Sequence, residues 1–441
     1  MSFPRYPAYK DSGLEWLGEV PEHWVVKRIA SLYREVVEQG SDELPVLSVS
    51  IHHGVSDSEL SEEEMDRKVT RSEDRSKYKR VSAGDLVYNM MRAWQGAFGT
   101  VCVEGMVSPA YVVARPTSIV PSTWIEYLLR TDPAINEIKR FSRGITDFRL
   151  RLYWDEFKNL RVCLPPCNER DALLEFLDRE TAKIDALIAE QQRLIELLQE
   201  KRQAVISQAV TKGLNPEAPM KDSGVEWLGE VPEHWTLKRL KHLSPNLTVG
   251  IVVNPSEYVS DEGLPFVYGG DIREGVIDWE NSRRIAPAMS DKQAKTRLRS
   301  GDLLMVRVGA PGITAVVPAE CEGGNCASVM LIRQGSFSSQ WLCFTLNTRI
   351  VRFQVEVVQY GAAQEQFNIS HAVNFWLPVP PRQEQDRIAT FLLSEHEKAQ
   401  GLILQAQNAV SLLQERRSAL ISAAVTGQID VRGLVPEASA A

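Results

Sequence analysis

Two long stretches of the sequence place apolar residues along one face of a helix. After Pro165-Pro166, no proline or glycine occurs until Gly213, and the apolar residues recur at steps of three, four or seven. This spacing is typical of an amphipathic α-helix, and a proline pair often marks a helix boundary. The pattern predicts a helix of about 43 residues, roughly 60–65 Å long at 1.5 Å per residue. Its apolar face contains Leu173, Leu177, Ile184, Ile188, Ile195, Leu198, Val205 and Ala209.

The second stretch repeats this face at one constant offset along the chain. Gly213 and Gly427 follow the two stretches as typical helix stops, whereas Gly401 lies inside the second and predicts a weaker or more bent helix. A lone helix of this length would expose a continuous apolar stripe, so we expect the two helices to pack on each other as a coiled coil. The alternative is that each helix covers the core of its own domain. The apolar counterparts are Ile388, Leu392, Ala399, Ile403, Val410, Leu413, Leu420 and Ala424.

A second repeat lies upstream of each helix. Residues 10–24 read KDSGLEWLGEVPEHW and residues 221–235 read KDSGVEWLGEVPEHW, so this frame differs at a single position. The chain is therefore a head-to-tail duplication of one module of roughly 215 residues. Between the frames, residues 29–152 and 240–368 share little beyond short turns. Duplicated frames indicate a repeated structural role, and divergent inserts indicate that each copy recognises something different.

Each insert has the pattern of a mixed α+β domain. The segment LPVLSVSI at 44–51 alternates apolar and polar residues, which predicts a half-buried strand. Residues 84–86 and 301–303 both read Gly-Asp-Leu and are typical of a turn that enters a strand. Short helices are predicted at 124–129 and 339–346. Together these elements predict a compact α+β domain of about 130–150 residues for each insert.

The composition is that of a globular protein. No apolar run reaches the roughly 20 residues of a membrane span, and the N-terminus lacks the apolar stretch of a signal peptide, so we expect a cytoplasmic protein. The formal net charge of −8 argues only weakly against a nucleic-acid partner, because clustering of basic residues matters more than the sum. The six cysteines form no C-x-x-C pair. Buried thiols are therefore expected rather than a zinc site or a disulfide framework.

No catalytic signature stands out. The phosphate-binding pattern G-x-x-x-x-G-K-[ST] is absent. The segment SPAY at 108–111 resembles the tetrapeptide of amino-methyltransferases, but it lacks the second proline and an upstream glycine-rich cofactor loop. His52 and His53 have no acidic or cysteine partner at metal spacing, and His23 and His234 belong to the duplicated frame. We interpret these histidines as turn or structural residues and expect no catalysis, metal or cofactor in this chain.

Both inserts carry residues suited to nucleic acid. Runs of Lys and Arg can bind phosphates, and polar residues beside aromatics or glycine, at 92–96 and 364–368, can bind base edges. The alternative is a solvated surface neutralised by acidic neighbours such as 62–64, with Trp94 and Phe367 in the core. The candidate DNA-binding residues are Arg71, Arg75, Lys77, Lys79, Arg92, Gln95, Arg143, Arg149, Arg283, Arg284, Lys295, Arg297, Arg307, Gln364, Gln366 and Asn368.

The frame D-S-G-x-E-W-L-G-E-V-P-E-H-W, the L/V-P-P before each helix and the L-L-Q-E-[KR]-R ending resemble the specificity subunits of type I restriction-modification systems. In that family, two variable target recognition domains each read one half of a split DNA sequence, and the conserved helices pair antiparallel as a spacer. The resemblance implies three kinds of partner: double-stranded DNA, two methyltransferase subunits, and endonuclease/translocase subunits. It also implies that the methylated base is adenine, flipped into a partner's pocket. S-adenosylmethionine, ATP and Mg²⁺ would then belong to partner subunits.

The repeat and the resemblance together predict an α+β protein with two globular target recognition domains. A pair of long antiparallel coiled-coil helices separates them, and an internal pseudo-twofold repeat relates them. We expect a non-catalytic subunit that recognises an asymmetric bipartite site and positions methyltransferase and endonuclease subunits. Two other hypotheses are a coiled-coil scaffold for protein partners without sequence-specific DNA reading, and an enzyme, such as a nuclease, with an unrecognised site. The expected boundaries are 1–165 and 213–380 for the recognition domains, 166–212 and 381–427 for the helices, and 428–441 for a C-terminal tail.

Overall fold

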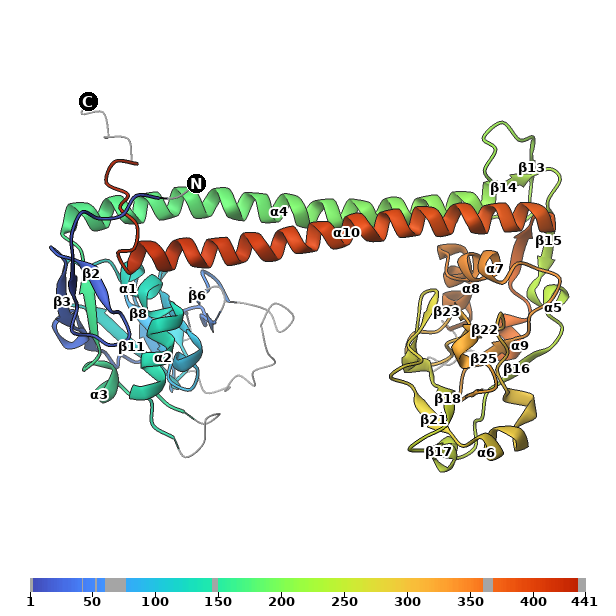
Figure 1. The fold of residues 1–441 in the computed structure, drawn as a ribbon, viewed down its shortest axis with the longest axis horizontal. Helices are drawn as coiled ribbons and strands as arrows, with labels where there is room; N and C mark the ends of the chain where they lie inside the picture. Colours follow the sequence, from blue (N-terminus) through green and yellow to red (C-terminus); the bar gives the residue numbers. More distant parts are fainter. Residues whose placement is uncertain are drawn as a thin grey trace. The chain divides into compact units, whose positions relative to one another are not determined.

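The computed structural model forms two compact units, which are described separately (Figure 1). Unit 1 comprises residues 1–191 and 408–441, and unit 2 comprises residues 192–407. Each unit contains one half of each of two long helices, α4 (Cys167–Lys212) and α10 (Arg382–Val425). None of the described helices is long and apolar enough to cross a membrane. The structure describes residues 3–41, 43–51, 54–59, 77–144, 150–359 and 368–434.

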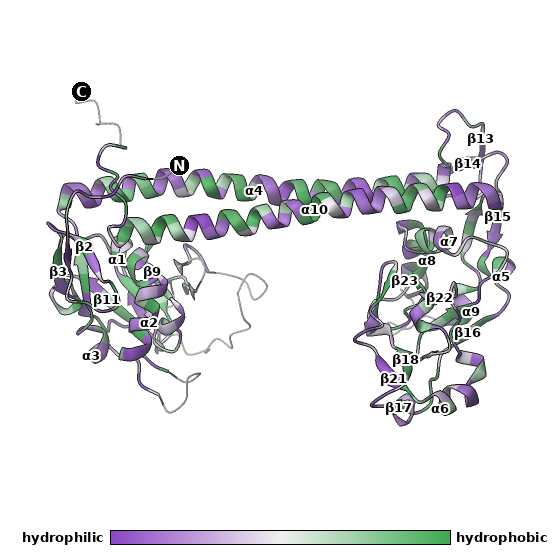
Figure 2. Ribbon diagram, in the orientation of Figure 1, coloured by the Kyte–Doolittle hydropathy of each residue, from purple (hydrophilic) through white to green (hydrophobic). Residues whose placement is uncertain are grey.

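Inside each unit, the halves of α4 and α10 run antiparallel and pack through their apolar faces. In unit 1, Leu173 near the start of α4 shares a core with Ala424 near the end of α10. In unit 2, Val205 near the end of α4 packs against the core that contains Ile388 from the start of α10. Hydrophobic and hydrophilic residues alternate along both helices (Figure 2). The predicted antiparallel helix pair is therefore confirmed, and Gly401 does not interrupt α10.

The duplicated frame fixes the start of α4. Glu169, in the first turn, accepts hydrogen bonds from the Trp24 Nε1 atom at 2.8 Å and from the Tyr6 hydroxyl at 2.7 Å. The Nε2 atom of His23 lies 2.5 Å from the same carboxylate. A carboxylate at this position also offsets the positive end of the helix dipole. The frame histidine is thus part of a structural contact.

The second frame makes the same contact with α10. Glu384 accepts a hydrogen bond from the Trp235 Nε1 atom at 3.1 Å and lies 2.8 Å from the Nε2 atom of His234. The helices also end alike, because Gly213 and Gly427 follow them with φ values of 78° and 76°. Glycine adopts this left-handed conformation at little cost, which suits a helix stop.

The segment before the first frame contacts the segment after α10 in unit 1. The backbone N–H of Asp430 donates to the carbonyl oxygen of Pro4 at 2.8 Å, and the Tyr9 hydroxyl donates to the carbonyl oxygen of Gly427 at 3.1 Å. The segment after α10 therefore packs beside the first frame, as the segment after α4 packs beside the second.

The insert of unit 1 is built on an antiparallel sheet in the order β4-β11-β8-β9. Leu86 and Tyr88 of the central strand face the main core, and Val87 faces a second apolar cluster, so both faces of the sheet are covered. The predicted helix at 124–129 is present as α1. The elements are β4 (Tyr33–Glu35), β8 (Leu86–Asn89), β9 (Phe98–Thr100), β11 (Tyr111–Pro116), α1 (Ser122–Leu129), α2 (Asp132–Phe141) and α3 (Trp154–Phe157).

The insert of unit 2 has a sheet of the same order, β16-β25-β22-β23, again antiparallel. Leu303 and Met305 face the main core and Leu304 faces a second cluster. Two inserts with little sequence in common therefore share one skeleton, which the sequence comparison did not detect. The elements are β16 (Leu247–Val249), β22 (Leu303–Met305), β23 (Thr314–Val316), β25 (Met330–Ile332), α7 (Ser339–Leu346), α8 (Arg349–Gln359) and α9 (Ile369–Ala372).

Smaller sheets surround these skeletons. Each frame forms a hairpin and a second strand pair, and unit 2 has an additional sheet in the order β17-β21-β18-β24. In unit 1 the pairs are β1 (Tyr9–Asp11) with β2 (Glu19–Pro21), β3 (Val25–Arg28) with β12 (Arg161–Leu164), β5 (Val49–Ser50) with β6 (Gly54–Val55), and β7 (Lys79–Val81) with β10 (Gly105–Val107). In unit 2 they are β13 (Met220–Asp222) with β14 (Glu230–Pro232), β15 (Thr236–Arg239) with β26 (Trp376–Val379), and β19 (Ile272–Arg273) with β20 (Val276–Ile277). The remaining elements are β17 (Val259–Ser260), β18 (Leu264–Val267), β21 (Arg283–Ile285), β24 (Asn325–Cys326), α5 (Leu240–Leu243) and α6 (Pro287–Lys292).

The strand predicted at 44–51 is mostly wrong. Only Val49–Ser50 forms a paired strand, and Val46 makes an isolated bridge to Met106. The alternation has a different cause. Val46 packs into one small apolar cluster, whereas Leu47 and Val49 pack into another.

Candidate nucleic-acid interface

A buried ion pair fixes the start of β8 in unit 1. Asp85 is 1% exposed, and its Oδ1 atom lies 3.0 Å from the Nε atom of Arg115 on the neighbouring strand β11. The Ser122 hydroxyl, at the start of α1, donates to the carbonyl oxygen of Gly84 at 2.6 Å. Gly84 itself has a φ of 89°, which favours glycine in the turn. These contacts fix the position of β8 in the sheet. They therefore also fix the position of the loop that follows the strand.

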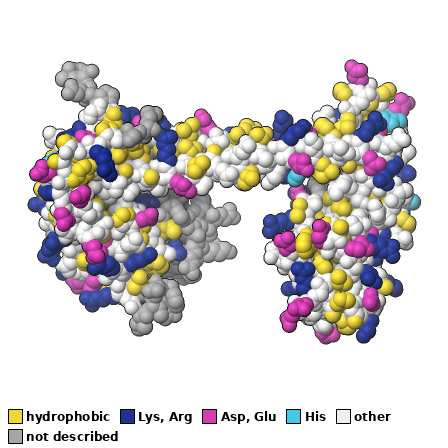
Figure 3. All heavy atoms as spheres, in the orientation of Figure 1, with side chains coloured by type: hydrophobic (Ala, Val, Ile, Leu, Met, Phe, Trp, Pro, Cys, Tyr) yellow, Lys and Arg dark blue, Asp and Glu magenta, His cyan; other side chains and the backbone are white. Residues whose placement is uncertain are grey.

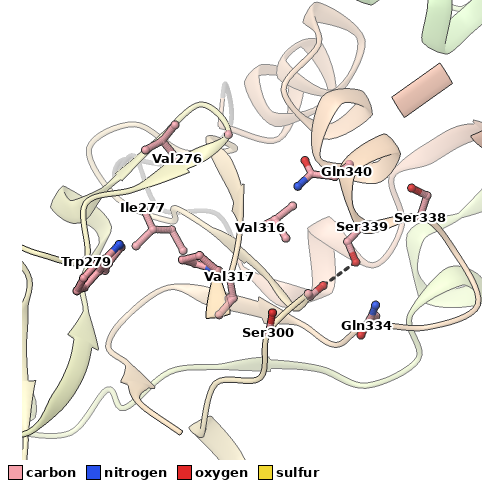
Figure 4. A pocket seen from close by; sticks show the side chains of 13 residues that line it. Val276, Ile277, Trp279, Ser300, Val316, Val317, Gln334, Ser338, Ser339 and Gln340 are labelled. Carbon is pink, nitrogen blue, oxygen red and sulfur yellow. Dashed lines mark hydrogen bonds between the residues drawn. The ribbon is translucent and has the colours of Figure 1, made fainter. Parts of the chain in front are cut away.

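Unit 2 repeats the arrangement at β22. Asp302 is also 1% exposed, and its Oδ2 atom lies 2.6 Å from an Nη atom of Arg333, the residue that follows β25. The Ser339 hydroxyl donates to the carbonyl oxygen of Gly301 at 2.6 Å, a bond that Figure 4 shows as a dashed line. The loops that follow β8 and β22 thus leave equivalent strands at equivalent places.

The loop after β8 carries two of the predicted DNA-binding residues. Arg92 is half-buried and Gln95 is exposed, on either side of a single turn of 3₁₀ helix. The Asn89 side chain accepts a hydrogen bond from the backbone of Met91 at 3.0 Å, and the Trp94 indole donates to the carbonyl oxygen of Met91 at 2.9 Å. The loop is therefore held by its own side chains while Gln95 faces solvent.

The segment that carries Arg143 lies beside this loop. Arg143 and Arg151 exchange two backbone hydrogen bonds of 2.9 and 2.8 Å, and the backbone N–H of Leu152 donates to the carbonyl oxygen of Met90 at 2.9 Å. Arg143 itself is exposed and pairs with Glu156 at 2.5 Å. Two groups of predicted residues that are far apart in the sequence thus meet at one end of β8.

One residue at this place, Tyr111, was not among the predicted residues. Tyr111, the first residue of β11, is paired with Asn89 across the sheet, and its side chain lies near both Asn89 and Arg92. Burial raises the pKa of the Tyr111 hydroxyl. The sequence indicated Tyr111 only indirectly, as the last residue of the SPAY tetrapeptide, which resembles a methyltransferase motif.

In unit 2, the loop after β22 brings Arg307 and Asn368 together. An Nη atom of Arg307 donates to the Oδ1 atom of Asn368 at 3.0 Å. Asn368 is exposed and caps α9. The loop turns back through Gly309 and Gly312, which have φ values of 84° and 91°. The pair lies at the end of β22 that corresponds to the Arg92 loop of unit 1.

Four other basic candidates of unit 2 lie outside the loop that carries Arg307. Arg283 and Arg284 are on β21, and the guanidinium carbon of Arg283 is 4.1 Å from the ring centroid of Tyr268. Arg284 is half-buried, and its guanidinium donates to the carbonyl oxygen of Glu280 at 3.1 Å. Tyr268 is a further residue that the sequence did not single out.

Lys295 and Arg297 lie at the end where β22 begins. Their carbonyl oxygens accept hydrogen bonds of 2.8 and 2.7 Å from Arg333, the partner of Asp302. Arg297 also pairs with Asp291 at 2.9 Å. The structure therefore divides the candidate residues of unit 2 into separate groups.

The first basic run is only partly described. Lys77 is exposed. The Lys79 ammonium donates to the carbonyl oxygen of Tyr111 at 2.7 Å, and burial lowers its pKa. The Lys79 side chain thus stabilises the fold, and a DNA contact by it stays a prediction. The candidates Arg71, Arg75, Arg149, Gln364 and Gln366, together with His52, His53 and Phe367, lie outside the described residues.

Unit 2 also contains an open pocket of about 540 Å³ between the β19–β20 hairpin and the start of α7 (Figure 4). Val276, Trp279 and Val316 form an apolar side, and Gln334 and Gln340 form a polar side. None of the described residues that line it is charged or among the predicted DNA-binding residues.

Charges are mixed over the surface that Figure 3 presents. Lys and Arg side chains are interspersed with Asp and Glu on both units in this view. Among the described residues, no group of three or more His, Cys, Asp and Glu side chains could hold a metal ion. Neither unit presents a uniformly basic face in this view.

The chain is similar to specificity subunits of type I restriction enzymes. It is 25% identical over 280 residues to the EcoBI specificity subunit of Escherichia coli, covering 60% of this chain and 58% of that one. It is 26% identical over 197 residues to the EcoKI specificity subunit of Escherichia coli strain K12, covering 44% and 39%. The matched regions thus span well under two thirds of each curated relative. No protein-family model matches the sequence.

Solved structures show the same fold. A chain from a study of complex assembly and conformational transition of the type I R-M system is 18% identical, with a TM-score of 0.62 and coverage of 92% of this chain and 98% of that chain. The HsdS subunit from Thermoanaerobacter tengcongensis is 17% identical, with a TM-score of 0.50 and the same coverage. The resemblance and the fold class expected from the sequence are confirmed.

Proposed function

We propose that this chain is the DNA sequence-recognition subunit of a type I restriction-modification system, in which each insert reads one half of an asymmetric bipartite site. The observation that carries the proposal is the pair of equivalent loops at the ends of β8 and β22. One presents Arg92 and Gln95, and the other presents Arg307 beside Asn368. Equal skeletons with unequal loop side chains suit two reading heads for unlike half-sites.

The side chains in these loops have the chemistry that base reading requires. Arg can donate two hydrogen bonds to the O6 and N7 atoms of guanine, and Asn or Gln can pair with the N6 and N7 atoms of adenine in the major groove. Exposed cations outside the loops, such as Arg283, Lys295 and Arg297, suit phosphates, which position a protein without specifying sequence. In this proposal, loops give specificity and the outlying cations give salt-dependent affinity.

The duplicated frames would hold the partners. Because α4 and α10 each contribute to both units, their length would set the unread gap between the half-sites. Two methyltransferase subunits would bind, one to each module, and endonuclease/translocase subunits would join the complete complex. The partners would bind S-adenosylmethionine, ATP and Mg²⁺ and methylate a flipped adenine in the cytoplasm, and this chain would supply no catalytic group.

Binding to defined duplexes tests the proposal. Sequencing of methylated positions in host DNA would first give the bipartite site. The chain with its methyltransferase partner should then prefer that duplex over a random one by about a thousandfold or more, and affinity for both should fall with salt. Duplexes with one scrambled half-site are the control and should bind with intermediate affinity. A preference of only a few-fold, with the partner still bound, would instead support a protein-binding scaffold.

A further inference from the structure

The surroundings of one arginine differ between the two halves of the helix pair. In unit 1, the Nε atom of Arg417 on α10 lies 2.8 Å from the Oδ1 atom of Asp185 on α4. Beside this pair, Ile184 is 5% exposed and fills the space between the helices. The guanidinium is thus paired and the interface is packed.

Unit 2 has the same arginine without the same surroundings. Arg202 is the counterpart of Arg417 in the repeat, but the counterparts of Ile184 and Asp185 are Ala399 and Gln400. The Nε atom of Arg202 is buried, and no hydrogen-bond partner for it is found in the described part of the chain. One substitution removes the carboxylate, and the other removes the side chain that would fill the gap.

A pocket of about 210 Å³ lies between α4 and α10 where these side chains are missing. Lys201 and Arg202 line it from α4, together with the apolar side chain of Leu402 from α10, which is 50% exposed. Glu395 also lines it, but this carboxylate is paired with Lys398 at 2.7 Å. The pocket is therefore left with uncompensated positive charge.

His396 does not change this charge. Its ring lines the same pocket, and burial together with the Arg202 guanidinium lowers its pKa. It is therefore neutral at pH 7, because an unperturbed histidine already titrates below that pH.

We infer that this pocket binds the carboxylate of an Asp or Glu side chain on a helix of a protein partner, with Arg202 as the main donor. A buried donor that lacks an acceptor in the free chain gains most from an acceptor on a partner. Exposed Leu402, and Leu197 nearby on α4, which is 46% exposed, suit the apolar face of the same helix. A nucleic-acid backbone would supply the anion but would leave these leucines exposed.

The pocket makes the two halves of the helix pair unequal as binding sites for a partner. The pocket lies in the half in which Ala399 and Gln400 take the places of Ile184 and Asp185, so the same partner should bind the unit 2 half more tightly than the unit 1 half. This deepens the proposed function and rests on it, because the partner we choose as the probe is the methyltransferase subunit.

The chain itself supplies the test. The double variant Ala399→Ile/Gln400→Asp gives unit 2 the residues of unit 1, which already pack in an equivalent helix pair. We expect the pocket to close, Arg202 to pair with the new carboxylate, and the free chain to melt at a higher temperature. Titration of the full chain with the methyltransferase subunit, followed by native mass spectrometry and calorimetry, should show the tighter of the two sites weakened about tenfold or more.

Two variants control for a general effect of charge. Arg417→Gln breaks the Arg417–Asp185 pair of unit 1 without creating a pocket for a partner's carboxylate. Methyltransferase affinity should therefore stay within about twofold. Ile184→Ala/Asp185→Gln should create the pocket in unit 1 and strengthen the weaker site. Unchanged binding by Ala399→Ile/Gln400→Asp would overturn the inference alone. A wild-type chain that binds no methyltransferase subunit would overturn the proposed function and the inference with it.

Discussion

Strands β8 and β22 begin alike and end differently. At their starts, Asp85 and Asp302 are both buried against an arginine, Arg115 on β11 and Arg333 just after β25. At their ends, one loop carries Arg92 and Gln95 and the other carries Arg307. The starts are alike because the ion pair determines where the strand lies. The loops can differ because their side chains leave the sheet, and the contact between Arg307 and Asn368 joins residues outside its strands.

This difference separates two kinds of substitution. A change at a strand start removes one member of a buried pair and leaves the other charge uncompensated, which destabilises the fold. A change at a strand end removes a half-buried arginine donor and should alter DNA affinity with little effect on folding. The predictions below test that separation.

The largest effect is expected for Asp302→Ala. This change leaves the Arg333 guanidinium, which is 18% exposed, without its carboxylate and should lower the free energy of unfolding by about 3–5 kcal/mol. Asp85→Ala should cost unit 1 somewhat less, because Arg115 keeps a second carboxylate partner in Glu38. Urea unfolding followed by tryptophan fluorescence measures both.

Glu38 provides the matched control. Its carboxylate also pairs with Arg115, at 2.7 Å, but is 45% exposed, so Glu38→Ala should cost less than about 1 kcal/mol. If Asp85→Ala costs no more than Glu38→Ala, the buried pair does not define the skeleton.

A smaller effect is expected at the helix starts, where the two frames also differ. Glu169 accepts hydrogen bonds from Tyr6 and Trp24, whereas Glu384 lacks a tyrosine donor in the described contacts. Glu169→Gln should therefore cost about 2–3 kcal/mol and Glu384→Gln about 1–2 kcal/mol, because charge-assisted bonds to buried carboxylates are lost. Thermal unfolding of the two variants gives the order, and an equal or reversed order would contradict the role assigned to Tyr6.

The sequence predicted the long helices well because their evidence is local and repeated over many turns. Each of the eight apolar-face positions of the first helix has an apolar counterpart in the second, and the predicted helix at 339–346 is observed as Ser339–Leu346. The shared sheet of the inserts could not be read in the same way. Its defining contact joins Asp85, just before β8, to Arg115 on β11, and the sequence between them is unlike its counterpart. The prediction of a strand at 44–51 was mostly wrong. Residues that pack into two separate apolar clusters can alternate with polar residues as they do in a strand.

The sequence predicted which types of residue form the candidate site but not how the fold places them. Arg307 and Asn368 were chosen because of their neighbours in the sequence, and only the fold places them 3.0 Å apart. Tyr111 and Tyr268 were missed, since an aromatic residue in a strand reads as core. Sequence alone also could not separate Lys79, whose ammonium is held by a backbone carbonyl, from lysines free to contact phosphates.

DNA reading gives the third prediction, with an intermediate effect confined to binding. Arg307→Ala should lower affinity by about 1–3 kcal/mol and relax the preference for bases in one half-site only. Arg92→Ala should do the same for the other half-site. Competition binding with duplexes substituted at each position measures both, and Lys77→Ala, at an exposed lysine outside the loops, is the control expected to weaken all duplexes equally. Relaxation in both halves by either variant would contradict one reading loop for each half.

The last prediction changes no residue. It compares the reactivity of the cysteine thiols in the two units. In unit 2, burial raises the pKa of Cys321 to about 11 and those of Cys326 and Cys343 to about 12. In unit 1, burial raises the pKa of Cys163 to about 11, but Cys102 and Cys167 are exposed. Because the thiolate is the reactive form, iodoacetamide at neutral pH should label only these two residues in the native chain, as read by peptide mass spectrometry. The urea-unfolded chain should label fully and serves as the control. Rapid native labelling of Cys326 or Cys343 would mean that the sheet of unit 2 opens more readily than that of unit 1, and the two skeletons would then be alike in contacts but not in stability.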